Sequence, residues 1–203
     1  MLHYNTVEGK TLELLKSLMD FELFSNLRLV GGTSLALQLG HRISVDIDLF
    51  GEFKMDSAEL QSYLPEFGEC KVIKTSKNIN IFLINGIKVD FVNYSYPWIG
   101  NLISEQNIRM ADKMDIAAMK LAAISGRGTK KDYYDLYELL KHYTLAEMIG
   151  FYEQKYADGS VFLVLKSLLY FDDADADVMP VLFNKVPWEK VKKRIVDAFD
   201  GMG

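Results

Sequence analysis

Apolar residues recur with a helical period near the start of the chain and with a strand period soon afterwards. Between residues 9 and 24 they are spaced near 3.6, which predicts an amphipathic helix that covers a sheet. Residues 27–30 form a short apolar, strand-like run, and residues 45–50 alternate apolar and acidic side chains. We therefore expect a strand, a turn with a short helix over 35–39, and a second strand with one buried face.

A short helix is expected to end near Leu64, with Asp56 or Ser57 as its cap. Strand patterns continue over residues 69–75, 80–84 and 87–93. The last two flank Asn85-Gly86, a pair that favours a type I′ turn and therefore predicts a hairpin. Beyond Pro97 and Gly100 the period becomes helical. The helices expected there cover residues 112–125, 133–142, 144–155, 160–170 and 187–198, and Asp112 can cap the first of them.

The composition is that of a globular chain, with 203 residues, 49% hydrophobic and 25% charged. A single cysteine, Cys70, excludes an internal disulfide, and three distant histidines give no zinc-site pattern. We expect a cytoplasmic protein without a membrane span, because neither a signal-peptide pattern nor a long apolar run is present. The net charge of −5 disfavours non-specific nucleic-acid binding, so an RNA partner requires a local basic patch.

The turn between the first two strands carries residues suited to phosphate. Gly31 and Gly32 let the backbone turn tightly and let a ligand approach closely. Thr33 or Ser34 is expected to cap the short helix. Backbone N–H groups at the positive end of a helix dipole suit an anion, so we predict a phosphate cradle here. The alternative is an ordinary strand-to-helix turn.

Three acids on the expected sheet are candidates for metal binding. Asp46 and Asp48 alternate with apolar neighbours, which puts both on one face, roughly 6.7 Å apart along the strand. Two such carboxylates can hold a pair of Mg²⁺ ions about 3.5–4 Å apart. Asp90 interrupts an apolar strand, where a carboxylate is costly unless it is paired or binds a metal. The alternatives are a solvated strand face for the first two acids and a salt-bridged edge acid for Asp90.

Taken together, these residues resemble the signature of the DNA polymerase β-like nucleotidyltransferase superfamily, in which a third acid lies on a neighbouring strand. The fuller match is to the AbiEii/AbiGii toxin family (the MenT-like nucleotidyltransferases), where Gly-Gly-Thr, a small helix and His-Arg-x-Ser-x-Asp-x-Asp recur. The resemblance implies that Asp46, Asp48 and Asp90 bind metal and that the nucleotide contacts Gly31, Gly32, Thr33, Ser34 and Arg42. A salt bridge from Arg42 to Asp48 is the alternative for that residue, and His41 is expected to be structural.

The helix expected over 112–125 places one lysine, Lys120, in an apolar run. Its side chain either reaches along the helix to the surface or points into a cleft toward an anion. The resemblance favours the cleft, because Asp-x-x-Ala-x-Lys-Leu-x-Ala matches residues 115–123 and the family's lysine is functional. It implies that Lys120 contacts nucleotide phosphate.

A second family motif, Arg-x-x-x-Arg/Lys-Asp-x-x-Asp-Leu, follows this helix and is matched by Arg127, Lys131, Asp132 and Asp135. The first aspartate is functional in the family, which implies that Asp132 orients Lys120 or the base and acceptor. The alternative for Asp132 is a purely local role, a capping-box-like pair with Thr129. Nearby tyrosines are expected in the core, with stacking on bases as the alternative. Those tyrosines are Tyr133, Tyr134 and Tyr137.

The resemblance implies an α+β fold with two parts. A polymerase β-like mixed sheet with flanking helices would occupy residues 1–105, and a C-terminal helical region over residues 106–203 would complete the active-site cleft. The implied activity is Mg²⁺-dependent transfer of a nucleoside monophosphate from an NTP to an acceptor, with two ions expected. Some relatives use the 3′ end of tRNA as acceptor.

The implied role is that of a toxin in a type IV toxin–antitoxin or abortive-infection system, with a cognate antitoxin as partner. Two other functions stay open at this point. One is a small-molecule nucleotidyltransferase of the aminoglycoside-modifying type. The other is a non-catalytic module that binds a nucleotide or a partner.

Overall fold

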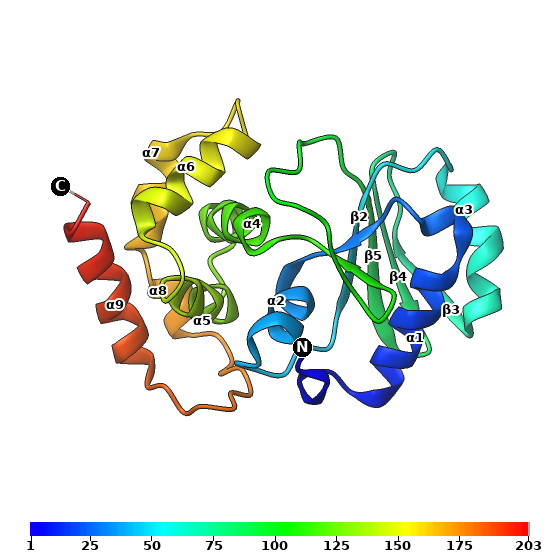
Figure 1. Cartoon of the computed structure of the whole chain (residues 1–203), viewed down its shortest axis with the longest axis horizontal. Helices are drawn as coiled ribbons and strands as arrows, with labels where there is room; N and C mark the ends of the chain where they lie inside the picture. Colours follow the sequence, from blue (N-terminus) through cyan, green and yellow to red (C-terminus); the bar gives the residue numbers. More distant parts are fainter. Residues whose placement is uncertain (203) are drawn as a thin grey trace. The chain divides into compact units, whose positions relative to one another are not determined.

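The computed structural model describes residues 1–202, which divide into two compact units (Figure 1). Unit 1 comprises residues 1–40, 44–95 and 102–111. Unit 2 comprises residues 41–43 and 96–101 and the chain from Asp112 onward. The units therefore interleave along the chain, whereas the sequence suggested one boundary after residue 105. Residues 41–43 follow α2 (Gly31–Leu39) and precede β2 (Ile47–Gly51) along the chain, but they belong to unit 2.

Unit 1 is built on a seven-stranded mixed sheet in the order β3-β4-β5-β2-β1-β7-β6. β2 runs parallel to β5 and antiparallel to β1, and β1 runs parallel to β7. β4 and β5 form the expected hairpin, with positive φ at Asn85 and Gly86 (49° and 81°), as a type I′ turn requires. The strands are β1 (Arg28–Leu29), β2 (Ile47–Gly51), β3 (Cys70–Lys74), β4 (Ile79–Ile84), β5 (Ile87–Asn93), β6 (Ile103–Glu105) and β7 (Ile108–Met110).

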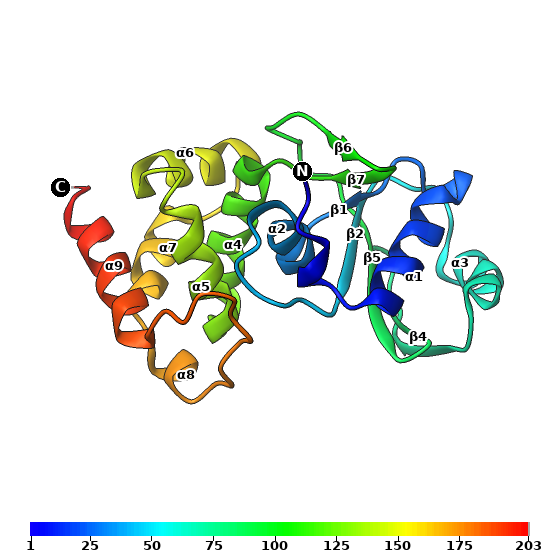
Figure 2. The same ribbon diagram turned by 60° about the horizontal axis from the view of Figure 1, so that its bottom comes forward.

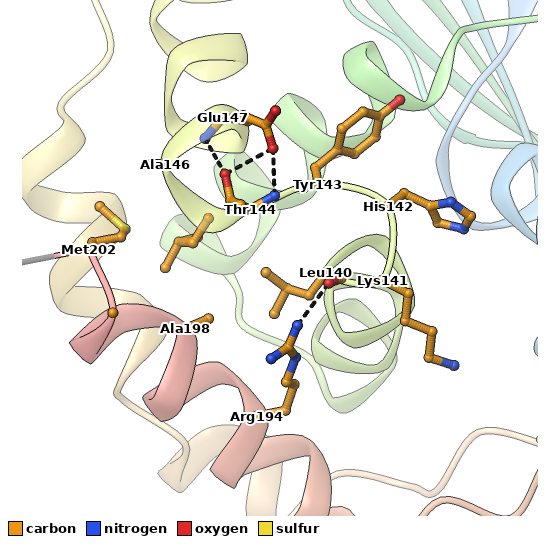
Figure 3. A pocket seen from close by; sticks show the side chains of 12 residues that line it. Leu140, Lys141, His142, Tyr143, Thr144, Ala146, Glu147, Arg194, Ala198 and Met202 are labelled. Atoms are coloured by element: carbon orange, nitrogen blue, oxygen red, sulfur yellow. Dashed lines mark hydrogen bonds between the residues drawn. The ribbon is translucent and has the colours of Figure 1, made fainter.

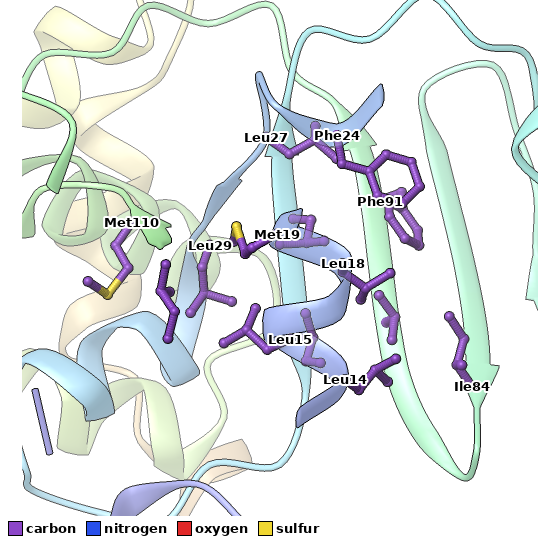
Figure 4. Packing of buried hydrophobic residues seen from close by; sticks show 14 of the residues in the cluster. Leu14, Leu15, Leu18, Met19, Phe24, Leu27, Leu29, Ile84, Phe91 and Met110 are labelled. Atoms are coloured by element: carbon purple, nitrogen blue, oxygen red, sulfur yellow. The ribbon is translucent and has the colours of Figure 1, made fainter. Parts of the chain in front are cut away.

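One face of this sheet carries the apolar core of unit 1. The expected amphipathic helix forms as α1 (Gly9–Asp20) and directs Leu14, Leu15 and Leu18 toward the strands (Figure 4). The helix α3 (Ser57–Tyr63) begins at the expected cap, because the Asp56 carboxylate accepts the N–H groups of Ala58 and Glu59. The remaining helices of this unit are α2 (Gly31–Leu39) and the short 3₁₀ helices Tyr4–Thr6, Glu22–Phe24 and Leu64–Phe67.

The alternation along β2 and β5 decides what the opposite face of the sheet presents. Ile47 and Leu49 on β2, with Val89 and Phe91 on β5, are fully or almost fully buried in the core. Because successive strand residues point to opposite faces, Asp48 and Asp90 lie on the face turned away from that core. The hydrophobic alternation thus fixes the side of the sheet on which the acids lie.

Unit 2 is helical, with α4 in contact with α5, α6 and α7, while α9 packs on α5. The Asp112 carboxylate caps α4 by accepting the Met114 N–H, as expected. Thr144 and Glu147 form a capping box at the start of α6. The helices of this unit are α4 (Lys113–Gly126), α5 (Lys130–Leu139), α6 (Leu145–Lys155), α7 (Val161–Leu168), α8 (Asp172–Asp175) and α9 (Trp188–Asp200).

A buried ion pair ties the segment 96–101 to two helices of unit 2. The Lys155 ammonium of α6 lies 2.7 Å from Asp115 Oδ1 of α4 and donates to the Pro97 carbonyl. The same carboxylate accepts the backbone N–H groups of Ile99 and Gly100. Asp115, which begins the family motif around Lys120, therefore anchors this segment.

The prediction of helical structure directly after residue 100 is wrong in one place. Residues 103–110 form the β6–β7 hairpin, which extends the sheet beyond β1 (Figure 2). Both strands are only three residues long, too short for a period-2 pattern to be distinguished in the sequence. Among the helices of residues 1–202, none is both long and apolar enough to cross a membrane.

Candidate functional site

The glycine turn lies directly over one of the acids in unit 1. The helix α2 begins at Gly31, which adopts a φ of +66°. A Cβ at this position would collide with the Asp48 carboxylate. Gly31 is therefore required for two reasons, its left-handed backbone and the close approach of Asp48.

The prediction that Thr33 or Ser34 caps this helix is wrong. The helix starts at Gly31, four residues before the expected start at residue 35, and no side chain caps it. The buried Thr33 hydroxyl instead donates to the Asp46 carbonyl and lies 2.9 Å from the Ser44 hydroxyl. Thr33 thus ties the first turn of α2 to the chain that enters β2, and Ser34 is a buried residue of the same helix.

The register of two parallel strands brings two of the predicted acids together. Asp48 on β2 is the direct partner of Asp90 on β5, so both carboxylates are on the face opposite the core. The third acid, Asp46, was expected inside the strand, but β2 begins at Ile47 and Asp46 immediately precedes it. All three side chains are partly buried rather than enclosed.

A lysine that the sequence analysis did not select lies among these acids. The Lys88 ammonium is 2.6 Å from Asp90 Oδ1, and both residues belong to β5 with one residue between them. Burial alone would lower the pKa of Lys88, but its hydrogen bond to Asp90 and the negative charges of the three carboxylates raise the pKa above its usual value. The period-2 pattern contained the signal, because residues 88 and 90 share a face.

Asp48 and Asp90 suit a hard divalent cation. Mg²⁺ prefers oxygen ligands and is commonly held by one or two carboxylates together with substrate phosphates. Two carboxylates on neighbouring strands, with Asp46 close in sequence, provide such a set. Within residues 1–202, no three His, Cys, Asp or Glu side chains are gathered closely enough to hold a metal by themselves. The donor set therefore fits an ion that shares its ligands with a substrate.

Unit 2 holds a second group of predicted residues around one carboxylate. The guanidinium of Arg42 forms a bidentate pair with Asp135, with Nε 2.6 Å from Oδ1 and Nη2 2.9 Å from Oδ2. His41 Nε2 lies 2.7 Å from the same Oδ1. Asp135 is fully buried. It belongs to α5, 93 positions further along the chain than Arg42, whereas the sequence analysis had considered a salt bridge to the nearby Asp48. His41, expected to be structural, is part of this cluster.

Lys120 joins Asp135 to Asp132. Its ammonium lies 2.5 Å from Asp135 Oδ2 and 2.9 Å from Asp132 Oδ1. The contact between Lys120 and Asp132 is consistent with the prediction that Asp132 orients Lys120. The alternative of a surface lysine is wrong, because Lys120 is only 4% exposed. Asp132 also pairs with Arg127 and accepts the Thr129 hydroxyl. Arg127 is the accessible member of the group, with its side chain 60% exposed.

The charges in this cluster hold one another ionised. Burial alone would raise the pKa of Asp135, but Arg42 and Lys120 hold it well below its usual value. Burial would also raise the pKa of Asp132, and Lys120 with Arg127 lowers it instead. The pKa of Lys120 is raised, because the two carboxylates outweigh its burial and the repulsion from Arg42. Lys120, Asp132 and Asp135 are therefore held in their ionised forms although they are buried.

Other residues near this cluster are occupied in packing or lie outside it. Tyr133, Tyr134 and Tyr137 are buried, which supports the core assignment over base stacking. Lys131 is partly buried at the start of α5. A pocket of about 510 Å³ lies elsewhere in unit 2, between the end of α5, the start of α6 and the end of α9 (Figure 3). Its Arg194 donates to the Leu140 carbonyl, and it contains none of the predicted site residues.

The architecture of the whole chain matches known nucleotidyltransferase structures. A protein from H. pylori, described as a candidate nucleotidyltransferase, superposes with a TM-score of 0.62 at 18% identity, covering 96% of this chain and 95% of that one. MenT4, a nucleotidyltransferase toxin from Mycobacterium tuberculosis H37Rv, gives a TM-score of 0.57 at 17% identity, covering 95% and 86%. At these identities the likeness establishes the fold, which is the predicted polymerase β-like α+β fold.

The sequence identifies the family. Residues 13–199 match the family model described as nucleotidyl transferase AbiEii toxin, type IV TA system. A protein of Aquifex aeolicus (strain VF5) described as uncharacterised is 35% identical over 189 residues, covering 89% of this chain and 90% of its own length. The chain belongs to the AbiEii family and is a nucleotidyltransferase.

Proposed function

We propose that this chain is a toxin that transfers a nucleoside monophosphate from an NTP to an acceptor hydroxyl with the help of Mg²⁺. The observation that carries the proposal is the pairing of Asp48 with Asp90 on adjacent parallel strands, with Gly31 directly against Asp48. These residues combine a carboxylate pair with the first turn of a helix, the two features that metal-bound triphosphates need.

In this reaction the acceptor oxygen forms a bond to the α-phosphorus, and the bond from that phosphorus to the β-phosphate oxygen breaks. Pyrophosphate leaves with the electron pair, and we assign the acceptor proton to the Asp90 carboxylate. Bound Mg²⁺, held by Asp46, Asp48 and Asp90, would supply positive charge to the phosphate oxygens. The Gly31 and Gly32 backbone, with Thr33 and Ser34 in the same turn, would hold the phosphates at the start of α2.

We assign the cationic cluster of unit 2 to the same reaction. Arg127, whose side chain is 60% exposed, is the member of the cluster that can reach a nucleotide phosphate. Asp132 and Asp135 then act as positioning residues that hold Lys120 and Arg42 in place. The proposed nucleotide-binding residues are Arg42, Lys120, Arg127 and Lys131, and Asp135 contributes to nucleotide binding through Arg42 and Lys120.

For the acceptor we propose the 3′ end of tRNA, and for the cellular role a toxin neutralised by a cognate antitoxin in the cytoplasm. The support is the description of the matching family as a type IV toxin family and the likeness to a nucleotidyltransferase toxin. Because the net charge is −5, binding of RNA would depend on local cations such as Arg127 and Lys131.

Incubation of the purified protein with each labelled NTP and either total RNA or an aminoglycoside tests this function. We expect label in small RNA, and no label after substitution Asp48→Asn. Asp197→Asn, an exposed acid on α9, is the matched control and should retain activity. Label in the aminoglycoside would identify a small-molecule transferase. If no NTP labels any acceptor, and if Asp48→Asn does not change the effect of the protein in cells, the enzymatic proposal is wrong and the chain is a non-catalytic binding module.

A further inference from the structure

The acidic face of unit 1 contains its own cation. Lys88 and Asp90 are both on β5 with one residue between them, and the β2–β5 register sets Asp48 opposite Asp90. Asp46 immediately precedes β2, and its negative charge also acts on Lys88. Lys88 therefore lies on the same face as Asp48 and Asp90, with Asp46 close to them.

The ion pair with Lys88 occupies one of the two carboxylate oxygens of Asp90. The ammonium is 2.6 Å from Asp90 Oδ1, and the Asp90 side chain is only 17% exposed. A divalent ion that binds this oxygen has to displace the ammonium, because two cations at van der Waals distance repel strongly. The Lys88 side chain is 38% exposed, so the ammonium has room to move toward solvent.

We propose that Lys88 is a tethered counter-cation that competes with the divalent ion for Asp90 and thereby weakens metal binding by the free protein. The inference rests on the metal site of the proposed function. In the absence of metal, Lys88 offsets the repulsion among three neighbouring carboxylates. When a metal enters, the positive charge of the ion replaces that of the ammonium, so the face is never left without a cation.

Direct titration with Mn²⁺, followed by the electron paramagnetic resonance signal of the free ion, tests this role without any substrate. Substitution Lys88→Met removes the charge and keeps most of the side-chain length. We expect its Kd for Mn²⁺ to fall by about tenfold or more, since a nearby positive charge no longer opposes the ion. Lys88→Arg keeps the charge and should stay within about twofold of the wild type.

Lys71→Met is the matched control for net charge. Lys71 is on β3 of the same sheet, its side chain is 68% exposed, and its ammonium pairs with Glu69 at 3.0 Å. This variant changes the net charge by the same amount as Lys88→Met, yet should leave the Kd unchanged. A Kd for Lys88→Met that equals or exceeds the wild-type value would overturn the proposal.

Thermal unfolding gives an independent second measurement. In EDTA the Lys88→Met protein should have a lower Tm than the wild type, because Asp90 loses its ion pair with Lys88. Addition of Mn²⁺ should raise its Tm by more than it raises the wild-type Tm. Equal shifts in the two proteins would contradict the proposed competition.

The outcomes separate this inference from the proposed function. If Mn²⁺ binds the wild type, is lost in Asp48→Asn and binds Lys88→Met no more tightly, the metal site stands and the role of Lys88 is wrong. If Mn²⁺ binds none of these proteins, the metal assignment itself is wrong, and the role of Lys88 is wrong with it.

Discussion

The two groups of charged residues in this chain differ in how completely they are buried and neutralised. In unit 1, the Lys88 ammonium pairs with Asp90 and lies near two more partly buried carboxylates, those of Asp46 and Asp48. In unit 2, Asp135 and Asp132 are fully buried and each has at least two cationic partners. The first group is partly exposed, so a bound cation can reach its carboxylates. The second is already ionised and paired, so it contributes to the packing of its own helices. We therefore expect substitutions in unit 1 to affect activity and those in unit 2 to affect stability as well.

The largest effect should come from the centre of the buried cluster. Asp135→Asn leaves Arg42 and Lys120 buried without their shared counter-charge, which should cost about 3–5 kcal/mol in the free energy of unfolding. Urea denaturation measures this loss. Asp173→Asn, an exposed acid on α8, should change stability by less than about 0.5 kcal/mol. A loss below about 1 kcal/mol for Asp135→Asn would contradict the expectation that the buried charges of unit 2 stabilise the fold more than the acids of unit 1 do.

The opposite behaviour is expected for Asp48 in unit 1. Asp48→Asn should lower nucleotide transfer by at least about 100-fold, because a metal ligand is lost. The free energy of unfolding should change by less than about 1 kcal/mol, since the carboxylate is only partly buried among like charges. Labelled-NTP transfer and urea denaturation of the same preparation measure the two quantities. A stability loss as large as that of Asp135→Asn would mean that both groups are structural.

A smaller effect on stability is expected at the glycine turn. Gly31→Ala puts a Cβ at a φ of +66° and against the Asp48 carboxylate, which should cost about 1–3 kcal/mol and lower activity. Gly150→Ala is the control, because Gly150 is inside α6 with open space around it. That variant should gain about 0.5–1 kcal/mol. Thermal unfolding ranks the two, and equal stability would show that the turn tolerates a side chain.

The smallest effect is the pH dependence of the buried cluster. The pKa values of Asp132 and Asp135 are lowered by folding, so their contribution is complete above about pH 4 and is lost as the pH falls through the folded pKa values. The pKa of Lys120 is raised, so its contribution is complete below about pH 10 and is lost only above that. The Tm difference between the wild type and Asp135→Asn should therefore stay constant between about pH 5 and about pH 9. A steady change across this range would contradict the ionised network.

The sequence was sufficient for the local features whose physical cause is local. The Asn85-Gly86 turn, the caps at Asp56 and Asp112 and the amphipathic helix α1 were all predicted correctly. Each depends on a backbone preference or a hydrogen bond within a few residues. The family was also apparent, because its motifs place glycines and acids at fixed spacings that one fold requires.

Local reasoning failed where a distant residue competed for the same group. Thr33 has the chemistry of a helix cap, yet its hydroxyl is taken by the Asp46 carbonyl. The role of Lys88 depends on the pairing of β5 with β2, whose residues are some forty positions apart. The β6–β7 hairpin is part of the sheet because β7 pairs with β1. This pairing cannot be recognised in the sequence, because both strands of the hairpin are only three residues long.

By itself, the sequence determined the fold class, the family, the alternation that places the acids of β2 and β5 on one face, and the residue types available for chemistry. Only the tertiary structure decided which of those residues meet. Arg42 reached Asp135 because residues 41–43 join unit 2, and the pairing of β2 with β5 brought Asp48 next to Asp90 and its partner Lys88. The physical reason is that a charged side chain takes the partner that burial and strand register bring within about 3 Å, whatever their separation along the chain.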